Sequence, residues 1–115
     1  MVDLKTRTKV FALRIIRLFG ALPNTTVAQV IGKQLLRSGT SVGANYREAS
    51  RGRSTPEFIS MLQISLQELE ETQYLLELLD ESEIVPAHKL ADLIEEANQL
   101  TSILVTCANN ARRHE

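Results

Sequence analysis

Residues 54–80 read STPEFISMLQISLQELEETQYLLELLD, and they decide the fold. Ser54 and Glu57 have the spacing of a helix capping box, and Pro56 suits the first turn of a helix. From there, apolar or small side chains recur at alternating steps of four and three residues, which is the pattern of a heptad seam. The seam positions are Phe58, Leu62, Ser65, Leu69, Thr72, Leu76 and Leu79. This stretch predicts a long helix that packs against other helices.

Three further segments have a helical period. The first runs from Asp3 to Gly20, with a stripe at Leu4, Phe11, Ile15, Leu18 and Leu22. The second starts at Thr25 after an Asn24 cap, with a stripe at Val27, Ile31, Leu35, Ser38, Val42, Asn45 and Ala49. Pro86 opens the last, with a stripe at Leu90, Leu93, Ala97, Leu100, Leu104, Cys107 and Ala111. Four helices with short loops predict an all-α, up-down-up-down four-helix bundle, with residues 1–115 as a single domain.

The second helix contains Gly32, Gly39 and Gly43, and each glycine costs about 1 kcal/mol relative to alanine. Three such costs indicate that another backbone lies close to this helix. A helix-turn-helix interpretation does not fit, because a turn at Gly32 or Gly39 would put polar residues at positions that need apolar packing.

The composition limits the class of protein. Hydrophobic residues make up 43% of the chain, which is enough for a core, and the single cysteine excludes an internal disulfide. No apolar run reaches the length of a membrane span, and Met1 to Lys9 does not resemble a signal peptide. We therefore expect a cytoplasmic protein that is not bound to a membrane.

The net charge of −1 hides an asymmetry along the chain. Residues 1–53 hold ten Lys or Arg and two acids, whereas residues 54–115 hold three Lys or Arg and twelve acids. Basic and acidic helices could neutralise each other within one chain or between copies. A basic face for nucleic acid is the alternative.

One face of the second helix carries polar residues opposite a polar line on the third helix. We predict a polar network inside the bundle that fixes the register of the two helices, built from Arg37, Ser41, Asn45, Glu48, Glu68 and Glu71. If the Arg37 pair is buried, removing Arg37 should cost about 3–5 kcal/mol. A small-ligand or catalytic pocket around Arg37, Glu68 and Glu71 is the alternative.

Arg47, Arg51 and Arg53 lie together at the end of the second helix. Arginine suits forked contacts with phosphate, so these three are the candidate nucleic-acid contacts, to RNA or DNA. The alternative is a solvated or acid-paired helix end. His88, His114 and Cys107 form no metal-binding or nucleophilic pattern, so we expect no metal, no cofactor and no catalytic residues.

The long helices leave apolar surface uncovered by the short first helix. The third helix adds a second apolar edge at Met61, Ile64 and Leu75. We expect the chain to self-associate through such surface.

The segment QLLRSGTSVGANYREA, residues 34–49, resembles the four helix bundle protein family, also called the 23S rRNA intervening-sequence protein or S23 family. Arg51, Ser54, Glu57-Phe58-Ile59, Glu68-x-x-Glu71-Thr72 and Leu22-Pro23 extend the resemblance over roughly residues 4–80.

This resemblance implies a left-handed bundle that assembles as a ring-like homo-oligomer, a pentamer. The fold is similar to that of the accessory protein of diversity-generating retroelements. The family has no established enzymatic activity, and its biochemical role is largely unknown. We therefore expect a non-enzymatic assembly scaffold or nucleic-acid-associated protein. A protein-partner adaptor that uses its acidic third and fourth helices is the alternative.

Overall fold

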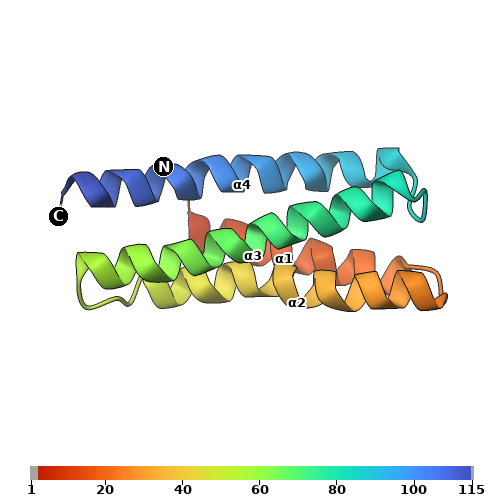
Figure 1. The fold of residues 1–115 in the computed structure, drawn as a ribbon, viewed down its shortest axis with the longest axis horizontal. Coiled ribbons are helices and arrows are strands. Elements are labelled where there is room, and N and C mark those ends of the chain that lie inside the picture. The colour runs from red at the N-terminus through yellow and green to blue at the C-terminus, as the bar shows by residue number, and fades with distance from the viewer. Residues whose placement is uncertain (1–2, 115) are drawn as a thin grey trace.

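The computed structural model describes residues 3–114. Its helices are α1 (Leu4–Ala21), α2 (Thr26–Ala49), α3 (Thr55–Glu81) and α4 (Ala87–Arg113), and this range contains no strand. Successive helices alternate in direction and form an elongated bundle of 47 × 21 × 20 Å (Figure 1). The C-terminal ends of α2 and α4 therefore lie at the same end of the molecule. The predicted all-α four-helix bundle is confirmed.

The heptad seam of α3 faces the core as predicted. Leu62, Leu69 and Leu76 are fully buried, and the polar seam residues Ser65 and Thr72 are fully buried too. With only three phenylalanines in the chain, the core is mainly aliphatic. Its largest fully buried apolar side chains are Phe11, Ile15, Leu35, Val42, Leu62, Leu69, Leu76, Leu79, Leu90, Leu100 and Leu104.

The seam of α4 departs from the prediction near its end. Ala108 is buried, whereas Cys107 is only half-buried. Steps of three and four residues average 3.5, while a straight helix has 3.6 residues per turn, so the buried face drifts to the next residue. The predicted inward position of Cys107 is therefore only partly correct.

The start of α2 also differs from the prediction. The side chain of Thr25, and not that of Asn24, caps the helix by accepting a hydrogen bond from the Ala28 backbone N–H at 3.2 Å. Val27, predicted to face the core, is 59% exposed, and Ala28 is buried in its place. Two successive steps of four, Val27 to Ile31 to Leu35, rotate the stripe by about 80°, which carries Val27 away from the core.

At the start of α3, the Ser54 side chain accepts from the Glu57 backbone N–H at 3.3 Å, as predicted. In a capping box, the Glu57 carboxylate would accept a hydrogen bond from the backbone N–H of Ser54. Here it accepts from the backbone N–H of the preceding residue, Arg53, at 3.2 Å. The last loop lies slightly later than expected, since α3 continues to Glu81 and Pro86 is the cap of α4.

The glycines of α2 permit α1 to approach closely. A Cβ atom on Gly39 would lie 2.8 Å from Cγ1 of Ile15, and one on Gly43 would lie 3.0 Å from the Thr8 hydroxyl. Both distances are too short for ordinary packing, so a side chain there would push α1 outward. The helix itself is continuous through Gly39, which agrees with the rejection of a helix-turn-helix motif.

Candidate functional site

The bundle consists of two helical hairpins, and the charge asymmetry of the sequence makes one of them basic and the other acidic. We refer to α1 and α2, residues 3–53, as the basic hairpin, and to α3 and α4, residues 54–114, as the acidic hairpin. Three ion-pair contacts occur within the described residues, and all of them join one hairpin to the other. They are Arg7 with Glu96, Arg37 with Glu68, and Arg37 with Glu71. Of the ten Lys and Arg residues in residues 1–53, only Arg7 and Arg37 therefore pair with an acidic residue within residues 3–114.

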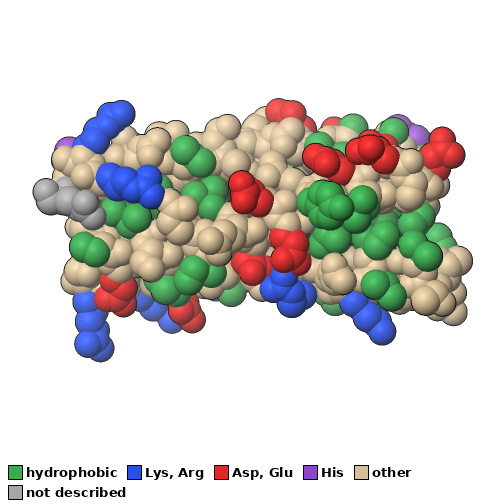
Figure 2. Space-filling view, viewed as in Figure 1, with side chains coloured by type: hydrophobic (Ala, Val, Ile, Leu, Met, Phe, Trp, Pro, Cys, Tyr) green, Lys and Arg blue, Asp and Glu red, His purple; other side chains and the backbone are tan. Residues whose placement is uncertain are grey.

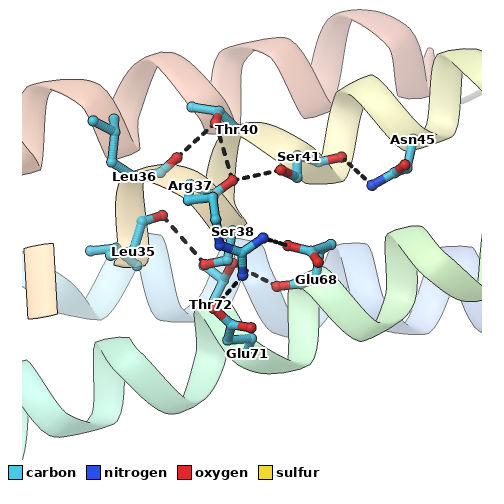
Figure 3. Close-up of polar contacts among 10 residues, drawn as sticks. All are labelled: Leu35, Leu36, Arg37, Ser38, Thr40, Ser41, Asn45, Glu68, Glu71 and Thr72. Carbon is cyan, nitrogen blue, oxygen red and sulfur yellow. Dashed lines mark hydrogen bonds and ion pairs between the residues drawn. The ribbon is translucent and has the colours of Figure 1, made fainter. Parts of the chain in front are cut away.

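Arg37 lies between two carboxylates of α3 (Figure 3). Its Nη1 is 2.9 Å from Glu68 Oε2, and its Nη2 is 2.6 Å from Glu71 Oε2. The hydrogen bond that Arg37 donates to the Glu71 carboxylate is the largest influence that raises the pKa of Arg37. The side chain of Arg37 is nevertheless 55% exposed, so the expectation of a pair inside the bundle is wrong. The neighbouring Ser38 takes the inward position, which leaves Arg37 at the rim of the interface between α2 and α3.

The buried polar contacts between α2 and α3 come from small hydroxyl side chains instead. The hydroxyls of Ser38 and Thr72 lie 2.9 Å apart, and Ser65 donates to the backbone carbonyl of Val42 at 2.7 Å. All three hydroxyl residues are fully buried. Within residues 3–114, every buried side-chain nitrogen or oxygen has a hydrogen-bond partner. These hydroxyls can therefore fix the register of α2 and α3 without the desolvation cost of a buried charge.

The other predicted members of the network do not join it. Ser41 donates to the carbonyl of Arg37 at 2.7 Å, and the Asn45 amide donates to the carbonyl of Ser41 at 3.0 Å, so both bond within α2 (Figure 3). Glu48 is exposed. Their spacing correctly placed them near one face of α2, but short side chains there reach their own backbone before they reach α3.

Arg7 and Glu96 form a second polar contact that the sequence analysis missed. Arg7 Nε and Nη2 each lie 2.8 Å from a carboxylate oxygen of Glu96, and Nη2 also lies 2.7 Å from Gln99 Oε1. These hydrogen bonds lower the pKa of Glu96. The two residues are far apart in sequence, so no spacing pattern could reveal the pair. Only the adjacency of α1 and α4 in the bundle brings them together.

Arg47, Arg51 and Arg53 are all exposed at one end of the bundle. The antiparallel topology adds Arg112 and Arg113, which close α4 at this same end. Figure 2 shows Lys and Arg side chains gathered here, on the left, and acidic side chains toward the opposite end of α3 and α4. We refer to these five arginines as the basic end. Arg112 and Arg113 are not among the nucleic-acid contacts predicted from the sequence, although the predicted up-down topology places them at the same end as Arg51.

A recess of about 550 Å³ lies at the basic end, where the loop between α2 and α3 meets the end of α4. Arg53 and His114 both line it, together with the apolar Phe58 and Ala111. Residues from two distant parts of the chain therefore share one solvent-accessible surface. None of the five arginines of the basic end forms an ion pair within residues 3–114.

The remaining candidates show no arrangement for chemistry. Burial raises the pKa of the Cys107 thiol, and it also raises that of the Tyr46 hydroxyl. Among the described residues, no three His, Cys, Asp or Glu side chains converge on a point that could hold a metal ion. No helix in this part of the chain has the length and apolar character needed to cross a bilayer. The cytoplasmic location stays a prediction.

The chain is similar to proteins of one family. The sequence pattern of the family described as 23S rRNA-intervening sequence protein matches residues 2–106. A crystal structure of a protein of unknown function from the S23 ribosomal protein family, from Bacteroides thetaiotaomicron VPI-5482, superposes with a TM-score of 0.87. The two chains are 37% identical, and the match covers 92% of this chain and 98% of that chain. No curated protein matches significantly. The chain therefore belongs to the 23S rRNA-intervening sequence protein family.

Proposed function

We propose that the protein is a non-enzymatic, homo-oligomeric scaffold that binds RNA or DNA through its basic end. The observation that carries this proposal is the convergence of Arg51 and Arg53 with Arg112 and Arg113 at one end of the bundle, without ion-pair partners in residues 3–114. The left-handed, ring-like pentamer implied by the family resemblance is part of the proposal.

Phosphate is the group that this end is best suited to bind. Guanidinium groups present forked donors that match phosphate oxygens, and they keep their charge at all physiological pH values. Within residues 3–114, the aromatic side chains Tyr46 and Phe58 near this end are both partly buried and form no exposed row that could stack on bases. We therefore expect contacts to the sugar-phosphate backbone and little preference for sequence.

Self-association is supported by apolar side chains that remain in solvent. Among residues 3–114, eight large hydrophobic residues are at least 39% exposed, namely Val10, Leu13, Ile16, Val27, Val30, Ile64, Tyr74 and Val105. Three of them, Val10, Leu13 and Ile16, lie on α1, which is the shortest of the helices. Such clustered exposure is typical of a surface that another molecule covers.

The non-enzymatic part of the proposal is supported by the geometry of the strongest polar cluster. Arg37 is half in solvent, and its guanidinium donors are directed to the Glu68 and Glu71 carboxylates of the same chain. Catalytic electrostatics work best where water is excluded and donors await a substrate. The alternative of an enzyme or small-ligand pocket at this cluster therefore gains no support.

The proposal is tested by measuring the affinity for a fluorescent single-stranded RNA and for a DNA duplex over a range of salt concentrations. If Arg51 and Arg53 contact phosphates, the double variant Arg51→Gln/Arg53→Gln should bind more weakly. For the single strand, its plot of log affinity against log salt concentration should be less steep than that of the unchanged protein, by about 1.4. The variant Arg112→Gln/Arg113→Gln should behave in the same way.

The matched control is Lys33→Gln/Lys89→Gln, which removes two exposed cations that lie away from the basic end. It should keep the affinity and slope of the unchanged protein, apart from the small effect of net charge. Equal losses in the control and the arginine variants would show that only overall charge matters. No binding at low salt would remove the nucleic-acid role.

A further inference from the structure

The outer face of α1 combines apolar and basic side chains in a regular order. Lys9, Leu13 and Arg17 follow each other at steps of four residues, so they lie along one face of the helix. Val10 and Ile16 lie beside Leu13, and these three apolar side chains are 46%, 46% and 40% exposed, respectively. Lys9 and Arg17 are exposed, and neither has an ion-pair partner within residues 3–114. We refer to these five residues as the α1 ridge.

The acidic hairpin carries a groove with the opposite character. It encloses about 410 Å³ between α3 and α4, and Leu76 and Ile94 form part of its apolar lining. Glu70, Tyr74 and Glu77 border it from one face of α3, and Tyr74 is 59% exposed. Neither glutamate has an ion-pair partner in the described part of the chain. We refer to this feature as the α3–α4 groove.

The ridge and the groove are complementary in charge and in spacing. Along α1, Lys9 and Arg17 are about 12 Å apart with Leu13 between them. Along α3, Glu70 and Glu77 are about 10 Å apart with Tyr74 between them. An apolar centre flanked by two cations thus matches an aromatic centre flanked by two carboxylates, and each surface supplies what the other lacks.

The two surfaces cannot meet within one chain. The helices α1 and α3 make no contact with each other, because they lie on opposite sides of the bundle. In the view of Figure 1, α3 passes in front of α1. Phe11 and Ile15 of α1 face the core, so Leu13 lies on the opposite side of α1, away from α3. Two different surfaces on opposite sides of one subunit are the requirement for a head-to-tail interface, which generates a ring when its rotation closes.

We propose that the α1 ridge of one copy docks into the α3–α4 groove of the next copy. This inference rests on the homo-oligomer of the proposed function and names the surfaces that form it. The basic hairpin of each subunit then contacts the acidic hairpin of its neighbour, which neutralises charges that remain unpaired inside the chain. Each subunit contributes one ridge and one groove.

The test uses two variants of the full chain and measures mass by light scattering. Leu13→Glu places a negative charge on the ridge opposite Glu70 and Glu77, and Tyr74→Lys places a positive charge in the groove opposite Lys9 and Arg17. Each variant alone should have the mass of one chain, 12.9 kDa. An equal mixture of the two should regain an assembly larger than one chain, because it contains one intact ridge and one intact groove.

Gln34→Glu is the matched control, since Gln34 is an exposed residue of the basic hairpin outside the ridge and the substitution adds the same charge as Leu13→Glu. It should assemble like the unchanged protein. Circular dichroism checks that each variant is folded, and Arg17→Glu replaces Leu13→Glu if the latter is not, with the same loss of assembly expected.

The inference would be overturned if the folded Leu13→Glu variant had the same assembled mass as the unchanged protein. A Tyr74→Lys variant that assembles normally would overturn it too, because a ridge-to-ridge contact would then suffice. A mixture that stays at the mass of one chain would exclude a head-to-tail match. If the unchanged protein itself has the mass of one chain, the homo-oligomer of the proposed function fails. If the unchanged protein assembles and the folded variants assemble in the same way, only the ridge-and-groove inference fails, so the two failures can be distinguished.

Discussion

Arg7 of α1 binds the carboxylate of Glu96 of α4 with two nitrogen donors, each 2.8 Å from a carboxylate oxygen. Among the helix pairs that touch, α1 and α4 share the smallest contact. The Arg7–Glu96 ion pair therefore lies in the smallest helix–helix interface of the bundle, whereas Arg37 lies at the interface between α2 and α3. Both contacts join the basic hairpin to the acidic hairpin, so the asymmetry along the sequence also stabilises the closed bundle.

We predict that Arg7 and Glu96 are coupled energetically. The two side chains are 28% and 17% exposed, so solvent screens them less than it screens a fully exposed pair. A double-mutant cycle with Arg7→Ala and Glu96→Gln, followed by urea unfolding, should give a coupling of about 1–2 kcal/mol. Additive effects of the two substitutions would show that the pair contributes nothing.

The same pair predicts a pH dependence of stability. Hydrogen bonds from Arg7 lower the pKa of Glu96 below its ordinary value of 4.5. The stabilisation from Glu96 is thus fully present above that value, and it is lost as the pH falls through the lowered pKa of the folded state. The difference in unfolding free energy between the unchanged protein and Glu96→Gln should be constant above pH 4.5 and shrink as the pH falls below it. A difference that stays constant, or that Asp92→Asn reproduces, would contradict this assignment.

The exposure of Arg37 changes the expected cost of removing it. Because the side chain is 55% exposed, Arg37→Ala should lower the free energy of unfolding by no more than about 1 kcal/mol. The loss should also diminish at high salt, since solvent ions screen this pair. Chemical denaturation at low and high salt measures both effects. A loss of several kcal/mol that salt does not reduce would indicate a buried pair.

Replacement of glycine by alanine should have opposite effects on stability at Gly39, which contacts α1, and at Gly20, which has open space around it. Gly39→Ala should destabilise the fold by about 1–3 kcal/mol, because the new Cβ would lie 2.8 Å from Cγ1 of Ile15. Gly20→Ala is the matched control, since nothing lies within 4 Å of a Cβ there, and it should stabilise the protein by about 0.5 kcal/mol. Thermal unfolding of both variants provides the test, and a neutral or stabilising Gly39→Ala would refute the close approach of α1.

The helices were predictable because each carries a regular seam with clear boundaries. Ser54 and Pro56 fixed the start of α3, and its seam residues from Leu62 to Leu79 are buried as the heptad pattern requires, whereas Phe58 in the first turn is only partly buried. The errors lie where the true helical period departs from the idealised steps, as at Val27 and Cys107. Side-chain burial at the ends of a stripe depends on the rotation of the whole helix, which local spacing does not determine.

The candidate site was only partly predictable. The sequence placed Arg37 near Glu68 and Glu71, but it could not show that Ser38 occupies the inward position and leaves Arg37 in solvent. The Arg7 contact with Glu96 depends on tertiary structure alone. The recess shared by Arg53 and His114 required the topology as well as the sequence, because it combines two chain segments that are far apart.

The mass of the purified protein, measured by light scattering with and without RNA at low salt, tests both self-association and nucleic-acid binding. We expect a multiple of 12.9 kDa for the protein alone and a larger complex when RNA is added. The complex should dissociate as the salt concentration rises, because arginine contacts to phosphate release counterions. A single-chain mass that RNA leaves unchanged would contradict both the assembly and the nucleic-acid role.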